Sequence, residues 1–243
     1  MKKDKKTTYR LDILRQESPD AEPYLQSFLY ETEDESATVA TALTAICDDP
    51  DFRDVEGKPA GTIGWECSCL QKRCGACAMV INGYPRLACD SVLSRVQRRG
   101  AVRVEPLKKF PVVRDLIVDR QPMMENLKRL RIWPDESTAV DGDNEHWAYE
   151  ASRCLQCGLC LEICPNFYAA GPFAGTAALS AASRLLAENE KAGKSELARD
   201  YGKYVYEGCG RSLACHDVCP AHVPVDDLLI HSNALAVWKR RGK

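Results

Sequence analysis

The sequence has 243 residues, 45% of them hydrophobic and 28% charged, which is enough apolar material for two small domains with separate cores. Its 33 Lys and Arg residues nearly balance 35 Asp and Glu residues, so the formal net charge is only −2. This charge gives no electrostatic footprint for nucleic acid, and we expect no nucleic-acid partner.

The 13 cysteines indicate metal binding rather than a disulfide scaffold. Disulfide-dense proteins are typically short and secreted, whereas this chain is long and starts with Met-Lys-Lys-Asp-Lys-Lys, without an apolar segment behind it. We therefore expect metal ligation in a reducing compartment. No stretch approaches the roughly 18 consecutive apolar residues of a membrane span, so any membrane association is expected through another subunit.

Three predicted elements open the chain. Residues 8–16 alternate apolar and polar side chains, as a half-buried strand does, and residues 24–31 predict a second strand. Residues 38–47 carry apolar side chains at helical spacing, and Ser36 is the predicted N-cap. The order strand, strand, helix is typical of a β-grasp fold.

The next stretch has the cysteine spacing of plant-type ferredoxins, which bind a 2Fe-2S cluster. Gly75 lets the backbone of this loop pass close to the sulfurs, where amide N–H groups can stabilise the reduced cluster. Residues 78–88 predict a hairpin around Asn82 and Gly83, which returns the fourth thiol to the loop. The four expected ligands are Cys69, Cys74, Cys77 and Cys89.

A second pattern, Cys-x2-Cys-x2-Cys-x3-Cys-Pro, is typical of bacterial ferredoxins. In such a run the fourth cysteine binds a different cluster from the first three, so a second run is required. The second run repeats the frame with one cysteine missing. The first run is Cys154, Cys157, Cys160, Cys164 and Pro165, and the second is Cys209, Cys215, Cys219 and Pro220.

Structural zinc is the alternative explanation of these cysteines. Zinc sites predict paired Cys-x2-Cys units about 15–20 residues apart. The runs of three closely spaced cysteines and the two Cys-Pro ends favour iron–sulfur clusters instead. Cys47 and Cys67 do not fit either spacing, and we expect both to be small buried residues.

The domain boundary is predicted between residues 1–118 and residues 119–243. Residues 102–106 predict the last strand of the first domain, and residues 112–131 have a helical period apart from Pro122. The first domain is therefore expected to be a β-grasp 2Fe-2S ferredoxin domain.

The second domain is predicted to be all-helical. Residues 173–190 have apolar side chains on one helical face, and residues 224–238 predict a terminal helix with proline in its first turn. The fold class is thus α+β, with a plant-type ferredoxin-like domain followed by a helical, bacterial-ferredoxin-like domain that holds two clusters.

Three groups of motifs resemble the iron–sulfur subunit of the succinate dehydrogenase and fumarate reductase family, over roughly residues 7–238. They are the 2Fe-2S loop with its hairpin, a segment that joins the two domains, and the two cysteine runs with the helix between them. The joining segment makes the resemblance specific, because cysteine spacing alone is shared with other proteins. The segments that match are 68–83, 87–89, 105–107, 110–119 and 173–179.

The resemblance, together with the rule for the fourth cysteine, implies how the runs share ligands. The position three residues after Cys209, where the frame expects a cysteine, holds Ser212. A site with three thiolates suits a 3Fe-4S cluster, which this family carries, and a serine-bound fourth iron is the alternative. The implied 4Fe-4S ligands are Cys154, Cys157, Cys160 and Cys219, and the implied 3Fe-4S ligands are Cys164, Cys209 and Cys215.

The resemblance also implies electron relay by a subunit that is not itself catalytic. Its partners would be a flavoprotein whose FAD interconverts succinate and fumarate, and membrane anchor subunits that bind a quinone and, in some relatives, haem. Its place would be the cytoplasmic face of a prokaryotic cell membrane, held there by the anchor. A free carrier would need neither this size nor the joining segment.

The expected quinone end departs from the family pattern. Relatives commonly carry a tryptophan pair after the first Cys-Pro and a histidine after the first cysteine of the second run, where this chain has Tyr168, Ala169 and Gly210. One interpretation is a different electron partner, such as a low-potential menaquinone or a non-quinone thiol; the other is neutral variation. The candidate quinone-proximal residues are Pro165, Tyr168 and Ser212.

Overall fold

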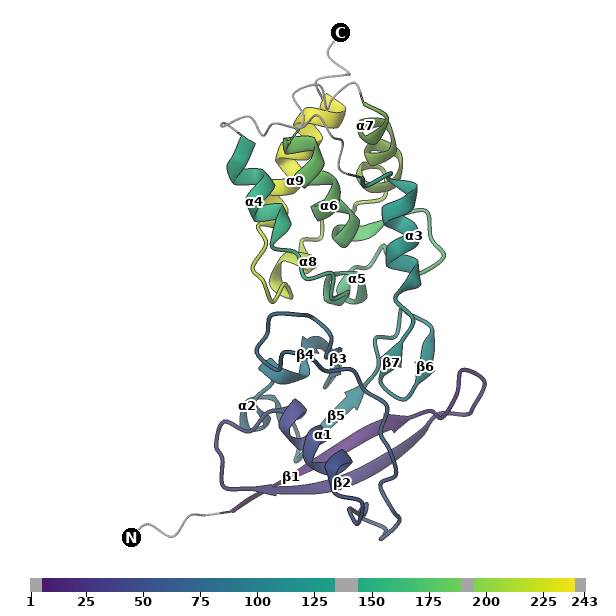
Figure 1. The fold of residues 1–243 in the computed structure, drawn as a ribbon, viewed down its shortest axis with the longest axis vertical. Coiled ribbons are helices and arrows are strands. Elements are labelled where there is room, and N and C mark those ends of the chain that lie inside the picture. Colours follow the sequence, from purple (N-terminus) through teal and green to yellow (C-terminus); the bar gives the residue numbers. More distant parts are fainter. Residues whose placement is uncertain (1–5, 134–143, 189–194, 239–243) are drawn as a thin grey trace. The chain divides into compact units, whose positions relative to one another are not determined.

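A computed structural model describes residues 6–133, 144–188 and 195–238. The chain divides into two compact units, Met1–Asp119 and Arg120–Lys243, and each is described by itself (Figure 1). The first unit is built on a five-stranded sheet, and the second is helical, as the sequence predicts.

The sheet of the first unit has the strand order β2-β1-β5-β3-β4. β1 pairs with β2 as an antiparallel hairpin and with β5 in parallel, while β3 is antiparallel to both β4 and β5. The hairpin predicted around Asn82 and Gly83 is therefore confirmed. The strands are β1 (Thr7–Arg15), β2 (Tyr24–Thr32), β3 (Ala78–Ile81), β4 (Tyr84–Leu87) and β5 (Ala101–Glu105).

Alternation along the strands creates the core of this unit. Leu11 and Ile13 of β1 are fully buried, and Leu11 lies opposite the fully buried Phe28 of β2. Because successive side chains of a strand point to opposite faces, this register puts one apolar face of the hairpin inward. Helix α1 (Val39–Asp48) buries five apolar residues, which completes the strand–strand–helix order of a β-grasp fold.

The N-cap of α1 is Thr38, and the prediction of Ser36 was wrong. The Thr38 hydroxyl accepts the N–H of Thr41 at 3.1 Å, and the Thr41 hydroxyl accepts the N–H of Thr38 at 3.3 Å. This reciprocal pair is a capping box. Ser36 instead donates its hydroxyl to Asp34 in the preceding loop. Both residue types cap helices well, so the sequence alone did not distinguish them.

We expect the Thr38→Ala substitution to lower the free energy of unfolding of the first unit by about 1 kcal/mol, because one N-terminal amide of α1 loses its acceptor. The matched variant Ser36→Ala should have a smaller effect, since Ser36 caps no helix. Urea denaturation of the two variants measures the difference. Equal losses would show that the loop hydroxyls, and not the capping box, hold this end of the helix.

Residues 112–118 form a β-hairpin, so the helical period predicted from residue 112 onward was wrong there. β6 (Val112–Arg114) and β7 (Ile117–Val118) pair antiparallel, and the turn residue Asp115 has the left-handed φ of 47°. The helix starts only at α3 (Gln121–Arg129), where Pro122 is tolerated because the first-turn N–H groups have no helical partner.

The second unit packs its helices around α6 (Gly175–Ala187), in which 10 of 13 residues are buried. Alanine and serine dominate its sequence, so neighbouring backbones approach it closely. It contacts helices on several sides (Figure 1). Besides α3, the other helices of this unit are α4 (Glu145–Ser152), α5 (Leu159–Ile163), α7 (Glu196–Tyr201), α8 (Ala214–Asp217) and α9 (Val225–Asn233), with π-helical turns at Gly202–Tyr206 and Ala234–Trp238.

The helices predicted at residues 173–190 and 224–238 correspond to α6 and to α9 with the π-helical turn that follows it. Pro224 is the N-cap of α9. Among the described residues, none of the helices has the length and apolar character needed to cross a membrane.

Candidate metal centres

The loop from Cys69 to Cys77 has an unusual backbone that turns its N–H groups toward sulfur. Leu70 and Lys72 have φ values of 51° and 62°, and Gly75 has a φ of 78°. Left-handed residues placed between right-handed ones make successive N–H groups converge, which forms a concave site for an anion. For Leu70 and Lys72, which carry side chains, this conformation costs of order 1 kcal/mol each.

Three backbone N–H groups of this loop donate to cysteine sulfurs. The amides of Gln71 and Arg73 each lie 3.3 Å from Sγ of Cys69, and the amide of Lys72 lies 3.3 Å from Sγ of Cys89. The bonds from Gln71 and Arg73 lower the pKa of the Cys69 thiol to about 7, because they stabilise the thiolate. The amide donors expected near the sulfurs are therefore present.

The β3–β4 hairpin joins the loop to its fourth cysteine. Cys77 precedes β3 and Cys89 follows β4, and Ala88 donates its N–H to the Cys77 carbonyl at 3.0 Å. Cys77 is buried, and burial raises the pKa of its thiol to about 12. A bound iron ion supplies the positive charge that a buried thiolate needs, so this donor set fits a cluster better than it fits free thiols.

The two other cysteines of this unit differ from each other. Cys47 is half-buried, and its Sγ lies 3.8 Å from the Ile63 carbonyl oxygen. Burial raises the pKa of the Cys47 thiol. Cys67 is exposed, so the prediction that it is buried was wrong. Its place just before the left-handed loop turns it toward solvent.

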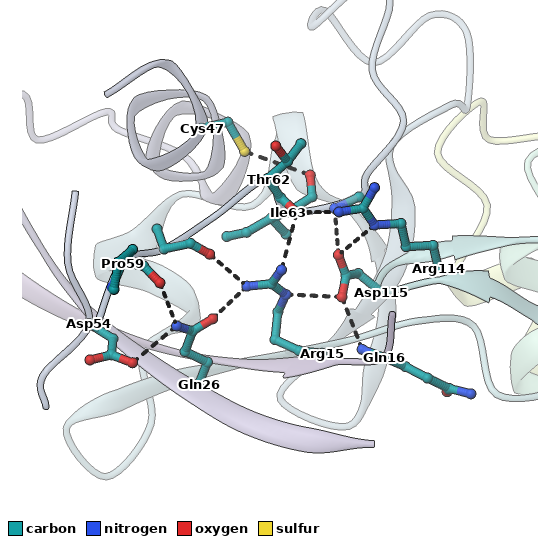
Figure 2. A network of polar contacts seen from close by, with 12 residues as sticks. Arg15, Gln16, Gln26, Cys47, Asp54, Pro59, Thr62, Ile63, Arg114 and Asp115 are labelled. Atoms are coloured by element: carbon teal, nitrogen blue, oxygen red, sulfur yellow. Dashed lines mark hydrogen bonds and ion pairs between the residues drawn. The ribbon is translucent and has the colours of Figure 1, made fainter. Parts of the chain in front are cut away.

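A buried ion pair between Arg15 and Asp115 anchors the segment that leads into the cysteine loop (Figure 2). Arg15 Nε donates to Asp115 Oδ1 at 2.9 Å, and the two side chains are 5% and 0% exposed. Asp115 also accepts the N–H groups of Gln16 at 2.9 Å and Gly64 at 2.7 Å. We call this group, with Gln26, the Arg15–Asp115 clamp.

The clamp fixes the backbone of residues 59–64 through several bonds. Arg15 donates to the carbonyls of Ala60 at 3.0 Å and Thr62 at 3.1 Å. Gln26 accepts a further bond from Arg15 and donates to Asp54 at 3.0 Å (Figure 2). Each polar group of the buried pair thus has a partner, as a buried charge requires. The clamp therefore sets where the chain enters the loop of Cys69.

In the second unit, the cysteines expected to bind the 4Fe-4S cluster line one small cavity. Three side chains of α6 complete its wall, namely Thr176, Ala177 and Ser180. The cysteines that line it are Cys154, Cys157, Cys160, Cys215 and Cys219. Burial raises the pKa of Cys157 to about 11 and that of Cys160 well above the usual range. Each thiolate therefore requires nearby positive charge.

The structure also brings together the three remaining cysteines of the two runs. Burial raises the pKa of Cys215, and the nearby thiols Cys164 and Cys209 raise it further. The hydroxyl of Thr176 bonds to Cys215 and has the opposite effect. Cys215 borders both groups of cysteines, so the two candidate centres adjoin one another around it.

The two cysteine runs repeat one backbone conformation. Gln156 and Gly158 have φ values of 51° and 86°, and their counterparts Arg211 and Leu213 have values of 55° and 56°. In both runs the second left-handed residue caps a short helix, α5 after Gly158 and α8 after Leu213. In this repeat Ser212 stands where Cys157 stands.

Comparisons with known proteins agree with these centres. Residues 10–125 match the model of a 2Fe-2S iron–sulfur cluster binding domain, and residues 150–223 match that of a 4Fe-4S dicluster domain. The succinate dehydrogenase iron–sulfur subunit of Bacillus subtilis is 35% identical over 230 residues, which cover 90% of this chain and 88% of that protein. The chain belongs to the iron–sulfur subunits of the succinate dehydrogenase and fumarate reductase family.

A second relative supports the assignment, and a solved structure has the same fold. The fumarate reductase iron–sulfur subunit of Haemophilus influenzae is 32% identical over 190 residues, which cover 70% of this chain and 73% of that protein. A chain of the Mycobacterium smegmatis Sdh1 complex has the same fold, with a TM-score of 0.77 at 20% identity over 98% of this chain and 99% of that one. The protein is thus an electron-transfer subunit of an oxidoreductase complex, with 2Fe-2S and 4Fe-4S domains.

The candidate quinone-proximal residues of this iron–sulfur subunit all lie at the surface of the second unit. Pro165 and Ser212 are exposed, and the Tyr168 side chain is 58% exposed. The Tyr168 ring lies over Gly171, where a Cβ atom would approach its Cζ to 2.9 Å. Tyr168 therefore depends on a glycine to hold its ring in this position.

Gly210, which replaces the histidine expected from the family, has a steric partner in Asn166. A Cβ atom at Gly210 would lie 2.7 Å from Asn166 Nδ2, which donates to the Gly208 carbonyl at 2.8 Å. Asn166 thus links the first Cys-Pro end to the residue before Cys209 and fills the space beside Gly210. Sequence reasoning missed Asn166, because its partner lies 42 residues away along the chain.

Among the residues that the structure describes, no three His, Cys, Asp or Glu side chains converge closely enough to hold a single metal ion. Iron–sulfur clusters do not require such convergence, because their cysteines are distributed over several irons that inorganic sulfide joins. Sequence reasoning also missed the hydroxyls of α6, where Ser180 bonds to Cys154 and Thr176 bonds to Cys215. Helical periodicity marks both positions only as buried.

Proposed function

We propose that this subunit relays electrons between the FAD of a flavoprotein and a quinone through a 2Fe-2S, a 4Fe-4S and a 3Fe-4S cluster. The observation that carries the proposal is the repeated backbone of the two cysteine runs, in which one thiolate is replaced by Ser212. A frame with seven cysteines and one serine suits one four-iron and one three-iron cluster.

The proposed ligands are those that the rule for the fourth cysteine and the family resemblance imply. The 2Fe-2S ligands are Cys69, Cys74, Cys77 and Cys89; the 4Fe-4S ligands are Cys154, Cys157, Cys160 and Cys219; and the 3Fe-4S ligands are Cys164, Cys209 and Cys215. Each cluster, when bound, takes up and passes on one electron. The protein supplies the hydrogen bonds and burial that set the potential of each step.

The backbone around Cys69 illustrates that role. The N–H groups of Gln71, Lys72 and Arg73 point at thiolates of the first site. Each donor stabilises added negative charge, so together they favour reduction of the site. Because they belong to the backbone, only substitution by proline removes them directly, and the left-handed residues Leu70 and Lys72 hold their direction.

The proposed partners are a FAD-containing flavoprotein and membrane anchor subunits that bind the quinone and, in some relatives, haem. The subunit would lie at the cytoplasmic face of a prokaryotic cell membrane and be peripheral, attached through the anchor. The 3Fe-4S site would face the quinone, with Pro165, Tyr168 and Ser212 at the surface beside it.

A second candidate function is transfer to a non-quinone partner, such as a thiol protein. The observation that favours it is that Asn166 occupies the space beside Gly210, where the family histidine is expected. At the position of that histidine, this chain has an internal link between two loops instead.

Purification of the complex from native membranes tests the proposal. We expect a flavoprotein and a membrane anchor to accompany the subunit, about nine irons per chain, and a 3Fe-4S electron paramagnetic resonance signal after air oxidation. A flavoprotein with a soluble cysteine-rich partner would favour the second function. An oxidised sample that lacks the 3Fe-4S signal would refute the proposed ligands around Ser212.

A further inference from the structure

The half-buried side chain of Gln156 makes polar contacts in the second unit that cysteine spacing does not explain. Its left-handed backbone, with φ of 51°, turns the side chain into the cavity lined by the cysteines. Nε2 of Gln156 lies 3.5 Å from Sγ of Cys154 and 3.3 Å from the carbonyl oxygen of Ala177 in α6. One amide group thus joins the cysteine run to the central helix.

The orientation of this amide is fixed by its two partners. A thiolate and a backbone carbonyl are both acceptors, so the group that faces them must be the NH2. A flipped amide would place its oxygen against both acceptors. Two N–H bonds can be made at once, one to Cys154 and one to Ala177, because the NH2 has two hydrogens.

The other end of the same amide is unsatisfied. Oε1 of Gln156 is buried and, in the described part of the chain, has no hydrogen-bond partner. A buried acceptor without a partner destabilises a fold, so an apolar side chain would serve packing better here. This cost indicates that the position needs the NH2 group as a hydrogen-bond donor and not only a side chain that fills space.

We propose that Gln156 sets the reduction potential of the 4Fe-4S cluster by donating a hydrogen bond to its Cys154 ligand. This inference rests on the ligands proposed above. Gln156 is a positioning and tuning residue, since it acts through Cys154. A donor to a ligand sulfur stabilises the reduced cluster more than the oxidised one, because the reduced cluster carries one more negative charge.

The counterpart of Gln156 in the second run behaves differently. Arg211 has the same left-handed backbone, but its side chain is exposed and its guanidinium carbon lies 5.8 Å from the centroid of the Tyr206 ring. The repeat therefore directs an amide to a sulfur in one run and a guanidinium to an aromatic ring in the other. Gln156 therefore tunes the 4Fe-4S cluster, and Arg211 supplies no equivalent donor to the 3Fe-4S cluster.

Ser180 gives Cys154 a weaker second donor. Its hydroxyl bonds to Cys154, yet its single proton is also drawn to the Thr176 carbonyl oxygen, 3.2 Å from Oγ. The NH2 of Gln156 has a hydrogen for each of its acceptors. Substitution of Gln156 should therefore have the larger effect on the cluster.

The test is a redox titration of the purified complex, followed by electron paramagnetic resonance, for Gln156→Leu and Gln156→Met. Both variants remove the donor but differ in shape. We expect each to disfavour reduction of the 4Fe-4S cluster by up to about tenfold, which for one electron is a shift of about 59 mV to lower potential. The 2Fe-2S and 3Fe-4S potentials are internal controls, and Gln121→Leu on the exposed first turn of α3 is the matched control variant.

The outcomes separate this inference from the proposed function. Wild-type complex without a 4Fe-4S signal would refute the proposed function itself. A wild-type signal with unchanged potentials in both variants would overturn the role of Gln156 alone. Loss of the cluster from both variants, or shifts that differ between leucine and methionine, would show that Gln156 acts through packing and would also overturn the inference.

Discussion

The Asp115→Ala substitution should lower the free energy of unfolding of the first unit by about 3–5 kcal/mol, because it leaves the Arg15 guanidinium buried without its counter-ion. The Arg15 side chain is only 5% exposed in the folded chain. The same change removes the acceptor for the N–H groups of Gln16 and Gly64. Hydrogen exchange of the β1 and β5 amides measures the loss.

Arg10→Ala is the matched control, because it breaks an ion pair of the same strand at the surface. Arg10 is 48% exposed and pairs with Asp12 at 2.8 Å, so its removal should change stability by at most about 1 kcal/mol. A loss for Asp115→Ala no larger than that for Arg10→Ala would contradict the role of the clamp. Asp115→Asn should fall between the two, since an amide oxygen still accepts one of the bonds.

The clamp also connects the fold to the first metal centre. Gly64 donates to Asp115 and accepts the N–H of Leu116 at 2.9 Å, so the segment before Cys69 is held from both sides of its backbone. Loosening that segment removes the constraint on where the loop begins. We therefore expect Asp115→Ala to weaken cluster retention as well as stability, whereas Arg10→Ala leaves retention unchanged.

The sequence predicted most of the architecture because its signals are local. The β1 and β2 strands alternate, Asn82 and Gly83 mark a hairpin, and cysteine spacing marks the metal loops. The clamp had no such signal, since Arg15 and Asp115 lie 100 residues apart. Its absence from the prediction also explains the error at residues 112–118, where a buried aspartate in a tight turn replaces the predicted helix.

Residue type and spacing predicted which cysteines belong together in the sites, but not the hydrogen bonds around them. Spacing groups cysteines, but the direction of an amide such as that of Gln156 depends on a left-handed backbone that residue type does not indicate. Exposure of Cys67 and the link from Asn166 to Gly208 depend on loop geometry in the same way. These features tune or place a site, and they follow from three-dimensional contacts.

The Ser212→Cys substitution should convert the three-iron site into a four-iron site. Ser212 occupies the position of Cys157 in a loop whose left-handed residues, Arg211 and Leu213, match Gln156 and Gly158. The backbone that presents the missing thiolate is therefore already in place. We expect iron to rise from about nine to about ten per chain and the 3Fe-4S signal of the oxidised complex to disappear.

Ser212→Ala is the matched control, because it removes the hydroxyl and adds no thiol. If a serine-bound fourth iron were present, this variant would lose iron, whereas a three-iron site predicts an unchanged iron content.

Ser212 is exposed while Cys157 is buried, so the new thiol of Ser212→Cys must move inward to reach the site. Leu213→Gly added to Ser212→Cys eases that movement, since glycine adopts φ of 56° without strain. If the site keeps three irons in Ser212→Cys and also in the double variant with Leu213→Gly, then the two runs share a backbone conformation but not a fourth ligand position.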